Sequence, residues 1–423
     1  MTDCFITKAT WAADGSLVDV LISKDAPTSH LNNGIDERGV HLAAHVTPAG
    51  QVQAPAGATI IDGTGQILLP GLTDLHARVS QSGKSSIKTV KLASQAAQQG
   101  GVTALLAMPS KSHMFDNPAA LDSFRDIADE LPRTDMVPAG CITLQCEGVQ
   151  QSPYNTLAGK GISIFTDGDI APSNMLMLYR AMQYIADLGL TFALRADVPA
   201  ISKDCYVHRS TSSYMLGMRG LPACAEEIGT ETILRLAADT QAKIHLQCVS
   251  TVESVNILRR NKGNATAEVA LHHLLFTHAD IGDFDTTYKT LPPLRGQTDC
   301  EALLDGIKDG TIDCIVSDHC PCSPFAKKQE FPSAPQGMIG LDTYLPSLYT
   351  KLVKTGKLSW AQLIQACCVR PAAILKGETD SALPVILFNP AETQAIQAET
   401  LPSGTLNSPY LGQELEGKVS FIG

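Results

Sequence analysis

The alternation of strands and helices constrains the fold of this chain more than any other feature. From about residue 67 onward, short apolar runs rich in β-branched residues alternate with helical stretches. Such runs are typical of strands that are covered on both faces. We find eight of them, at residues 71–78, 102–107, 139–143, 162–166, 191–195, 243–249, 267–270 and 311–317. This order predicts an α/β protein with a parallel (β/α)8 barrel of the TIM type.

Helical periodicity fills the gaps between these runs. Residues 84–99 and 223–238 carry apolar side chains at three-to-four spacing, and residues 341–353 and 359–375 also have a helical pattern. An open doubly wound sheet is the alternative architecture, but no Gly-x-Gly-x-x-Gly sequence follows a predicted strand. The barrel is therefore the preferred prediction.

The two ends of the chain have a different pattern. Residues 1–62 hold short β-prone runs separated by Gly and Pro, and residues 377–423 return to β-like sequence. We expect these two segments to form one small β-sandwich domain. The barrel is then expected to span residues 63–376.

Composition excludes several kinds of partner. A net charge of −11 and a pI near 5.4 argue against nucleic acid or an anionic membrane as a partner. No apolar run approaches the roughly 18 residues of a membrane-spanning helix, and the first residues lack the basic and apolar segments of an export signal. The 12 cysteines are scattered, which is typical of reduced thiols. We therefore expect a cytoplasmic protein.

Polar residues follow the predicted strands at the end where barrel enzymes carry their catalytic groups. In Asp74-Leu-His-Ala-Arg78, strict alternation along a strand would put Asp74, His76 and Arg78 on one face. The later strand ends carry Asp167, Arg195, Cys248, His272-His273 and Asp318. The sequence therefore predicts that these side chains gather at the mouth of the barrel.

Ten segments of the chain resemble the dihydroorotase branch of the amidohydrolase superfamily, and they occur in the family's order. They are Leu69-Pro-Gly-Leu-Thr-Asp-Leu-His76, Gly100-Gly-Val-Thr with Ala107-Met-Pro109, Phe165-Thr-Asp167, Gly220-Leu-Pro222 with Ala225-Glu-Glu227, Val249-Ser-Thr251, Glu268-Val with His272-His-Leu274, Pro292-Pro-Leu-Arg295, Ser317-Asp-His-Cys-Pro321, Gly337-Met-Ile-Gly-Leu341 and Arg370-Pro-Ala-Ala373. Each segment alone is a weak signal, but ten in order are specific.

The resemblance implies a site and a reaction. Family enzymes are similar in holding one or two zinc ions at the barrel mouth through histidines, a bridging carboxylate and a late aspartate. They interconvert carbamoyl aspartate and dihydroorotate, with the late aspartate as acid–base. By this resemblance, the retained metal positions are His76, the bridging Asp167 and the late Asp318, which is also the catalytic position.

Three further metal positions depart from the family. The resemblance puts family histidines at Arg78, Arg195 and Cys248. A guanidinium has no lone pair to give, and a unit charge about 4 Å from a dication opposes binding by roughly 8 kcal/mol at an effective dielectric near 20. We therefore expect no zinc cofactor. We predict instead that the two arginines neutralise Asp167 and Asp318 through bidentate hydrogen bonds.

The positions that hold the substrate's carboxylate in the family change as well. Ser80, Ser110 and Leu291 stand where the family has an arginine and two asparagines. Neither serine nor leucine supplies a charge-assisted fork for a carboxylate. For the pair His272-His273 we expect packing or hydrogen bonding.

These substitutions predict a catalytically inactive dihydroorotase homologue, which is not an enzyme. By the same resemblance, we expect a structural subunit that joins the catalytic chain of aspartate carbamoyltransferase in a self-associating hetero-oligomer of pyrimidine biosynthesis. Two alternatives stay open. One is an active dihydroorotase or other cyclic amidohydrolase whose altered metal site uses His76, Cys248 and two aspartates. The other is an anion-binding regulatory subunit that uses Arg78 and Arg195.

Overall fold

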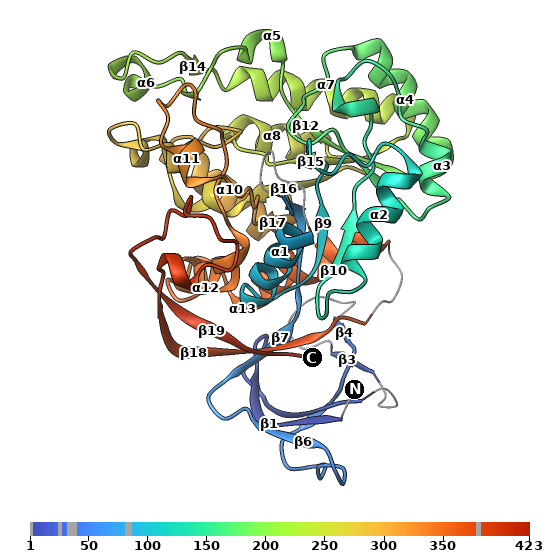
Figure 1. The fold of residues 1–423 in the computed structure, drawn as a ribbon, viewed down its shortest axis with the longest axis vertical. Coiled ribbons are helices and arrows are strands. Elements are labelled where there is room, and N and C mark those ends of the chain that lie inside the picture. The colour runs from blue at the N-terminus through green and yellow to red at the C-terminus, as the bar shows by residue number, and fades with distance from the viewer. Residues whose placement is uncertain (1–2, 24–27, 32–39, 81–86, 378–381) are drawn as a thin grey trace.

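The larger part of the molecule is a domain of eight parallel strands with helices around them (Figure 1). The computed structural model describes residues 3–23, 28–31, 40–80, 87–377 and 382–423. The barrel strands are β8 (Leu72–Ala77), β9 (Val102–Ala107), β10 (Asp135–Pro138), β11 (Ile164–Phe165), β12 (Thr191–Arg195), β15 (Lys243–Gln247), β16 (Thr266–Ala270) and β17 (Cys314–Val316).

The ring of strands closes through two single bridges. Strands β10, β9 and β8 form one parallel sheet, and strands β11, β12, β15, β16 and β17 form another. A parallel bridge between Gly140 and Phe165 joins β10 to β11, and a parallel bridge between Ala77 and His319 joins β8 to the chain after β17. The predicted (β/α)8 barrel is therefore confirmed.

The predicted position of the third barrel strand, β10, is wrong. The third strand ends at Pro138, whereas we expected it at residues 139–143. Beyond Pro138 the chain makes only isolated bridges in residues 139–143, from Gly140 to Phe165 and from Thr143 to Gln151, and the backbone N–H of Thr143 donates to Asp167. The apolar character of residues 139–143 comes from burial at the barrel mouth and not from pairing in the sheet.

Helices surround the strands in the upper part of Figure 1. The predicted helix at 84–99 begins outside the described residues, and its described part is α1; the predicted helix at 223–238 corresponds to α7. The two predicted later helices are broken into short segments. The helices are α1 (Ile87–Gln99), α2 (Pro118–Ala128), α3 (Tyr154–Ala158), α4 (Met175–Leu188), α5 (Pro199–Ser202), α6 (Thr211–Met215), α7 (Cys224–Thr240), α8 (Val252–Asn261), α9 (Leu271–Leu275), α10 (Gln297–Asp309), α11 (Pro324–Lys327), α12 (Tyr344–Leu348), α13 (Trp360–Ile364) and α14 (Arg370–Lys376).

A smaller β-domain contains strands from both ends of the chain, as predicted (lower part of Figure 1). Its sheet runs β19–β18–β7–β1–β2–β5, with β6 paired to β1, and a separate pair is formed by β3 and β4. The bounds are β1 (Cys4–Trp11), β2 (Leu17–Ile22), β3 (Ser29–Leu31), β4 (Val40–Leu42), β5 (His45–Pro48), β6 (Thr59–Asp62), β7 (Ile67–Pro70), β18 (Val385–Ala395) and β19 (Glu414–Ile422). A last short pair, β13 (Val207–His208) and β14 (Gly220–Leu221), lies outside this sheet.

Small apolar side chains fill the barrel. One buried cluster takes residues from or next to every barrel strand, among them Leu75, Leu106, Ala193 and Val316. A larger cluster lies between the strands and the helices and continues into the β-domain. Within the described part of the chain, every helix is too short or too polar to span a bilayer.

Candidate metal and catalytic site

Three side chains meet at the mouth of the barrel. His76 lies on β8, Cys248 directly follows β15, and Asp318 follows β17. Their potential ligand atoms all lie within 4.8 Å of one another, and the three residues are only 3–6% exposed. Cys248 and Asp318 have φ angles of 47° and 45°, a backbone conformation that residues other than glycine rarely adopt. The chain thus turns sharply at two strand ends to bring these side chains together.

A buried glutamate orients the imidazole of His76. Its Nδ1 hydrogen bonds to Glu268 Oε1 at 2.6 Å, and the other oxygen of Glu268 is bound by His245 Nε2 at 2.9 Å. The Nε2 atom of His76 is turned toward Asp318 Oδ1, 3.7 Å away, and has no hydrogen-bond partner among the described residues. A carboxylate behind an imidazole is the usual support of a metal-ligating histidine.

The charges around the three side chains favour a cation. Burial alone would lower the pKa of His76, but Glu268 and Asp318 outweigh it and raise that pKa to about 9. Burial raises the pKa of Asp318 to about 7, although His76 and Arg78 act in the opposite direction. Burial, with Asp318 and Glu268, also raises the pKa of the Cys248 thiol. A positive charge at this place therefore stabilises both a thiolate and a carboxylate.

The donor set fits a divalent metal. Imidazole nitrogen, thiolate sulfur and carboxylate oxygen are the three ligand types that zinc prefers. Glu268 and Asp318, which raise the pKa of His76, favour a positive charge at Nε2, and either a proton or a metal ion can supply that charge. The sequence had suggested Asp167 as a further ligand, but the structure leaves it outside this group.

Asp167 is held by a neighbouring loop. Its Oδ1 accepts the backbone N–H of Thr143 at 2.9 Å and its Oδ2 accepts the Thr143 hydroxyl at 2.6 Å. Burial raises its pKa in spite of these bonds. The resemblance had marked Asp167 as the bridging position, so its distance from the metal group is a difference from that expectation.

The two arginines are paired with other aspartates. Arg78 forms an ion pair with Asp169 and donates to Cys320 Sγ at 2.8 Å. Arg195 donates to the carbonyl of Asp169 at 3.0 Å and pairs with Asp197 at 3.2 Å. The prediction that these guanidiniums bind Asp167 and Asp318 is therefore wrong.

Sequence reasoning missed the partners that hold the site residues in place. Asp169 lies two residues after Asp167, and Asp197 two residues after Arg195, so alternation along the chain was a usable signal for both. Glu268 stands in a segment that carried the family resemblance, but its contact with His76 spans 192 residues and has no local signature.

In the first barrel strand, β8, the predicted alternation of side chains, with Asp74, His76 and Arg78 on one face, is wrong. The pairing of β8 with β9 shifts register between Asp74 and Ala77. Asp74 accepts hydrogen bonds from the backbone N–H and the hydroxyl of Ser317, while His76 binds Glu268. Asp74 is therefore a structural link to the strand end that carries Asp318.

A cavity of about 1010 Å³ is lined by residues that end or follow the barrel strands, among them Arg78, Asp167 and Arg195. Arg78 and Arg195 line it, together with Ser80, Ser110 and Leu291, the positions at which the family resemblance implies that substrate contacts are lost. The two serine hydroxyls hydrogen bond to each other at 2.9 Å. Among the described residues, the cavity lining does not include His76, Cys248 or Asp318.

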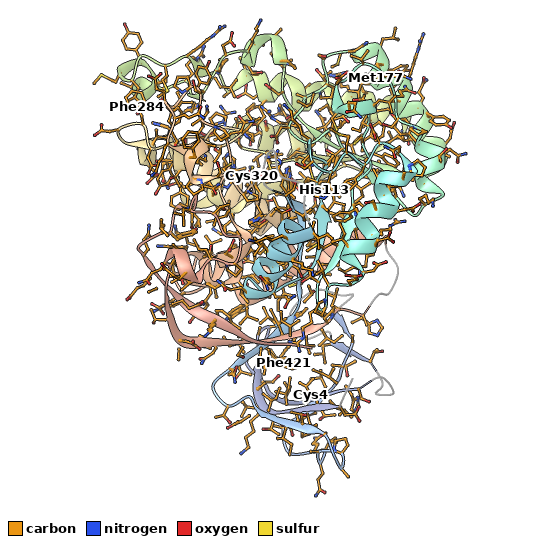
Figure 2. The ribbon with its side chains drawn as sticks, in the orientation of Figure 1. Cys4, His113, Met177, Phe284, Cys320 and Phe421 are labelled. Atoms are coloured by element: carbon orange, nitrogen blue, oxygen red, sulfur yellow. The ribbon has the colours of Figure 1, made fainter. Side chains whose placement is uncertain are left out.

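A pair of thiols borders the same cavity. Cys320 and Cys322 are both buried and line the cavity, and Figure 2 shows Cys320 in the barrel, above Cys4 and Phe421 of the small domain. Hydrogen bonding from Cys322, together with the nearby Arg78, lowers the pKa of Cys320 to about 6. The thiols thus contribute to the charge balance around Arg78.

Comparison with known proteins agrees with this architecture. The family model described as "Dihydro-orotase-like" matches residues 65–254. A protein named dihydroorotase from Leifsonia xyli subsp. xyli is 32% identical over an alignment covering 99% of this chain and 94% of that protein. One of the same name from Mycobacterium leprae is 31% identical over 96% of this chain and 93% of that protein.

The chain belongs to the dihydroorotase family. Among solved structures, the dihydropyrimidinase of Brevibacillus agri NCHU1002 has a TM-score of 0.79 at 19% identity, over 100% of this chain and 94% of that one. The D-hydantoinase of Thermus sp. has a TM-score of 0.80 at 18% identity, over 99% and 93%. These two likenesses support the amidohydrolase barrel fold.

Two expectations are corrected by these findings. Family relatives named dihydroorotase align with 85–99% of the chain, and the structure assembles a group that could hold a metal ion from His76, Cys248 and Asp318. The expectation that the chain is not an enzyme is therefore wrong, and so is the expectation that it uses no metal cofactor. The loss of histidines does not remove the site, because His76, Cys248 and Asp318 still meet and because Arg78 and Arg195 are paired with Asp169 and Asp197.

Proposed function

We propose that this chain is a metal-dependent cyclic amide hydrolase that interconverts dihydroorotate and carbamoyl aspartate through an altered metal site. The observation that carries the proposal is the buried group of His76, Cys248 and Asp318, in which His76 Nε2 has no hydrogen-bond partner in the described structure. The names of the relatives supply the reaction class.

One divalent ion would be held by His76, Cys248 and Asp318. An ion of this kind supplies Lewis acidity and lowers the pKa of water. Arg78 stands at a family ligand position and carries a fixed charge, so the proposed site is mononuclear. Glu268 keeps the Nδ1 proton of His76 and thereby directs Nε2 into the site.

Asp318 is the proposed acid–base. Hydrolysis breaks the ring C–N bond of dihydroorotate; the carbonyl carbon gains the hydroxyl of water and the ring nitrogen gains a proton. We propose that the Asp318 carboxylate accepts the proton from water and delivers it to the ring nitrogen. Burial, which raises the pKa of Asp318, favours this uptake of a proton. The reverse direction uses the same proton in the opposite order.

The cavity wall provides charge for an anionic substrate. Both dihydroorotate and carbamoyl aspartate carry carboxylates, and the guanidiniums of Arg78 and Arg195 line the cavity. Each is already paired with an aspartate, which leaves the wall less positive than two free arginines would make it. We therefore propose weaker carboxylate binding than a charge-assisted fork would give.

Turnover of dihydroorotate by the purified protein tests the proposal. The apoprotein is loaded with zinc, and hydrolysis is compared among wild type, Asp318→Asn and Asp309→Asn, an exposed aspartate on α10 that serves as a control. We expect metal-dependent turnover that Asp318→Asn lowers by about 100-fold or more, with the control unchanged. Absence of metal-dependent turnover in both reaction directions would overturn the proposal.

Binding without turnover has a separate meaning in this experiment. Saturable binding of carbamoyl aspartate that is lost in Arg195→Gln, with no hydrolysis, would favour the anion-binding regulatory alternative. Dihydrouracil, which lacks the carboxylate, is the matched ligand: the arginine variant should leave its binding unchanged.

Association with the catalytic chain of aspartate carbamoyltransferase, as part of a self-associating hetero-oligomer in the cytoplasm, stays a proposal that rests on the family resemblance. A catalytic site does not conflict with such an assembly. Co-expression of the two chains followed by size-exclusion chromatography tests it. We expect one peak with both chains, and separate elution of the two would contradict the proposal.

A further inference from the structure

Two thiols of the sequence Cys320-Pro-Cys322 lie close together at the wall of the large cavity. Both are free, and both contact the same acceptor, the carbonyl oxygen of Gln336, at Sγ–O distances of 3.6 Å. The Sγ atom of Cys322 is also 3.6 Å from the carbonyl oxygen of Cys320, and a hydrogen bond links the two thiols. The structure thus places two sulfur atoms side by side.

The backbone spacing of this pair suits a disulfide bond. Residues separated by one position have Cα atoms at most about 7 Å apart, and disulfides join Cα atoms that are about 4.4–6.8 Å apart. The side chain of Asn407 holds the backbone of both cysteines, since it accepts the N–H of Cys322 at 3.1 Å and donates to the carbonyl of Cys320 at 2.8 Å. Rotation of the two side chains is therefore the main movement that a bond between the sulfurs requires.

Arg78 favours reaction at the first of the two thiols. Its Nη1 donates to Cys320 Sγ at 2.8 Å. A guanidinium at this distance stabilises the negative charge that a sulfur gains while it gives up its proton and attacks an oxidant. Protein covers most of both thiols, but the cavity of about 1010 Å³ that they line gives a small molecule access to them. Cys320 is therefore the thiol that we expect to react first.

We propose that Cys320 and Cys322 are a peroxide-sensitive thiol pair that closes to a disulfide at the cavity wall. The Cys320 sulfur attacks one oxygen of hydrogen peroxide, so an S–O bond forms, the O–O bond breaks, and the thiol proton leaves with the second oxygen as water. The Cys322 sulfur then attacks the sulfenic sulfur, so the S–S bond forms and a second water leaves. Two electrons pass from the thiols to the peroxide.

This modification goes beyond the proposed function, because it needs neither a metal ion nor the cyclic amide. It would nevertheless change the wall of the same cavity. The sulfurs of a disulfide are about 2.05 Å apart, so Cys320 Sγ turns toward Cys322 and away from Arg78 when the bond forms. Since Arg78 lines the cavity, the oxidation state of the pair alters the surroundings of a cationic group that faces an anionic ligand.

Peptide mapping by mass spectrometry tests the proposal on the full-length, metal-free protein. The protein is treated with hydrogen peroxide, denatured, alkylated at its remaining thiols and digested. We expect a peptide in which Cys320 and Cys322 escape alkylation and which is two hydrogens lighter than its reduced form, and a dithiol reductant should restore both thiols. The Cys205→Ser protein is the control and should give the same result, although Cys205 also lines this cavity and contacts the carbonyl of Gly220 at 3.6 Å.

The Cys322→Ser protein tests the order of the two steps. Without the second thiol the reaction should stop at the sulfenic acid, so labelling of Cys320 by a 1,3-dione reagent should exceed that of wild type by about tenfold or more. Equal labelling of the two proteins would overturn the role of Cys322.

The wild-type peptide map needs no substitution, so the test holds even if Cys322→Ser does not fold. A pair that stays reduced while other cysteines are oxidised would overturn the proposal, and so would a disulfide from Cys320 to any other cysteine. Because the measured quantity is thiol mass and not turnover, either result would leave the proposed hydrolase function intact.

Discussion

The guanidinium of Arg78 is paired with Asp169 at the cavity wall and not with Asp318. The pairing matters because Arg78 stands where the family has a metal ligand, and an unpaired charge there would oppose a dication. With Asp169 beside it, the charge of Arg78 is largely neutralised. Burial alone would raise the pKa of Asp169, but the guanidinium of Arg78 outweighs burial and lowers that pKa. The carboxylate of Asp318 is thus left for the metal group.

Replacing this arginine tests its effect on metal binding. Arg78→His removes a fixed charge and adds an imidazole, so we expect zinc to bind at least about tenfold more tightly. Competition with a chromophoric chelator measures the affinity. Arg259→His, at an exposed arginine paired with Asp309, is the control and should have no effect. Equal affinity in wild type and Arg78→His would show that the charge is fully compensated or lies too far away.

The two carboxylates that the resemblance places at metal positions, Asp318 and Asp167, should behave differently. Asp318→Asn is expected to weaken zinc binding by about 100-fold, because it removes a charged ligand. Asp167→Asn should change it by less than about threefold, since Asp167 binds Thr143 and lies outside the metal group. Equilibrium dialysis with zinc measures both. An equal loss in the two variants would place Asp167 in the site after all.

A buried lysine holds one wall of the cavity. Lys289 Nζ donates to the carbonyls of Phe331, Pro332 and Ala334 at 2.7, 2.9 and 2.6 Å. Lys289→Met leaves three carbonyl groups without this donor, so we expect faster proteolytic cleavage in this segment and a loss of about 2 kcal/mol in the free energy of unfolding. Limited proteolysis and urea denaturation measure these effects. The exposed Lys328→Met is the control, and identical cleavage of the two variants would contradict the prediction.

The buried ion pair between Glu226 and Arg295 makes stability depend on pH. Glu226 accepts hydrogen bonds from the backbone N–H groups of Ser250 and Thr251 at 2.8 and 3.0 Å and pairs with Arg295 at 3.2 Å. Burial would raise the pKa of Glu226, but Arg295 and these hydrogen bonds lower it below 4.5. Glu226→Gln should therefore lower the free energy of unfolding by about 3–5 kcal/mol at pH 7.

The pH dependence of this difference has a defined sign. Because the folded-state pKa of Glu226 is lowered, the stabilisation is complete above the unfolded-state value of 4.5 and is lost as pH falls through the folded-state pKa. Urea denaturation of wild type and Glu226→Gln from pH 7 down to pH 3 should show a constant difference above about pH 4.5 that shrinks below it. A difference that grows on acidification would contradict the ion-pair account.

Much of the architecture could be predicted from the sequence because it depends on local patterns. Strands β9 and β12 have the predicted bounds, since buried apolar runs of five or six residues define them directly. The third strand was misplaced because residues 139–143 are buried for another reason, at the barrel mouth. Apolar runs report burial, and only pairing decides which buried run is a strand.

The site shows the same division more sharply. His76, Cys248 and Asp318 could be picked out from strand ends and family resemblance, and the structure brings those three together. Whether the site could hold a cation depended on two long-range contacts. Asp169 pairs with Arg78, which is 91 positions away in the chain, and Glu268 bonds to His76, which is 192 positions away. The sequence by itself determined the barrel and the residues at its mouth, because hydrophobic periodicity acts over short stretches. Only the tertiary structure decided which charges are paired, because ion pairing is set by distances in space that no local pattern encodes.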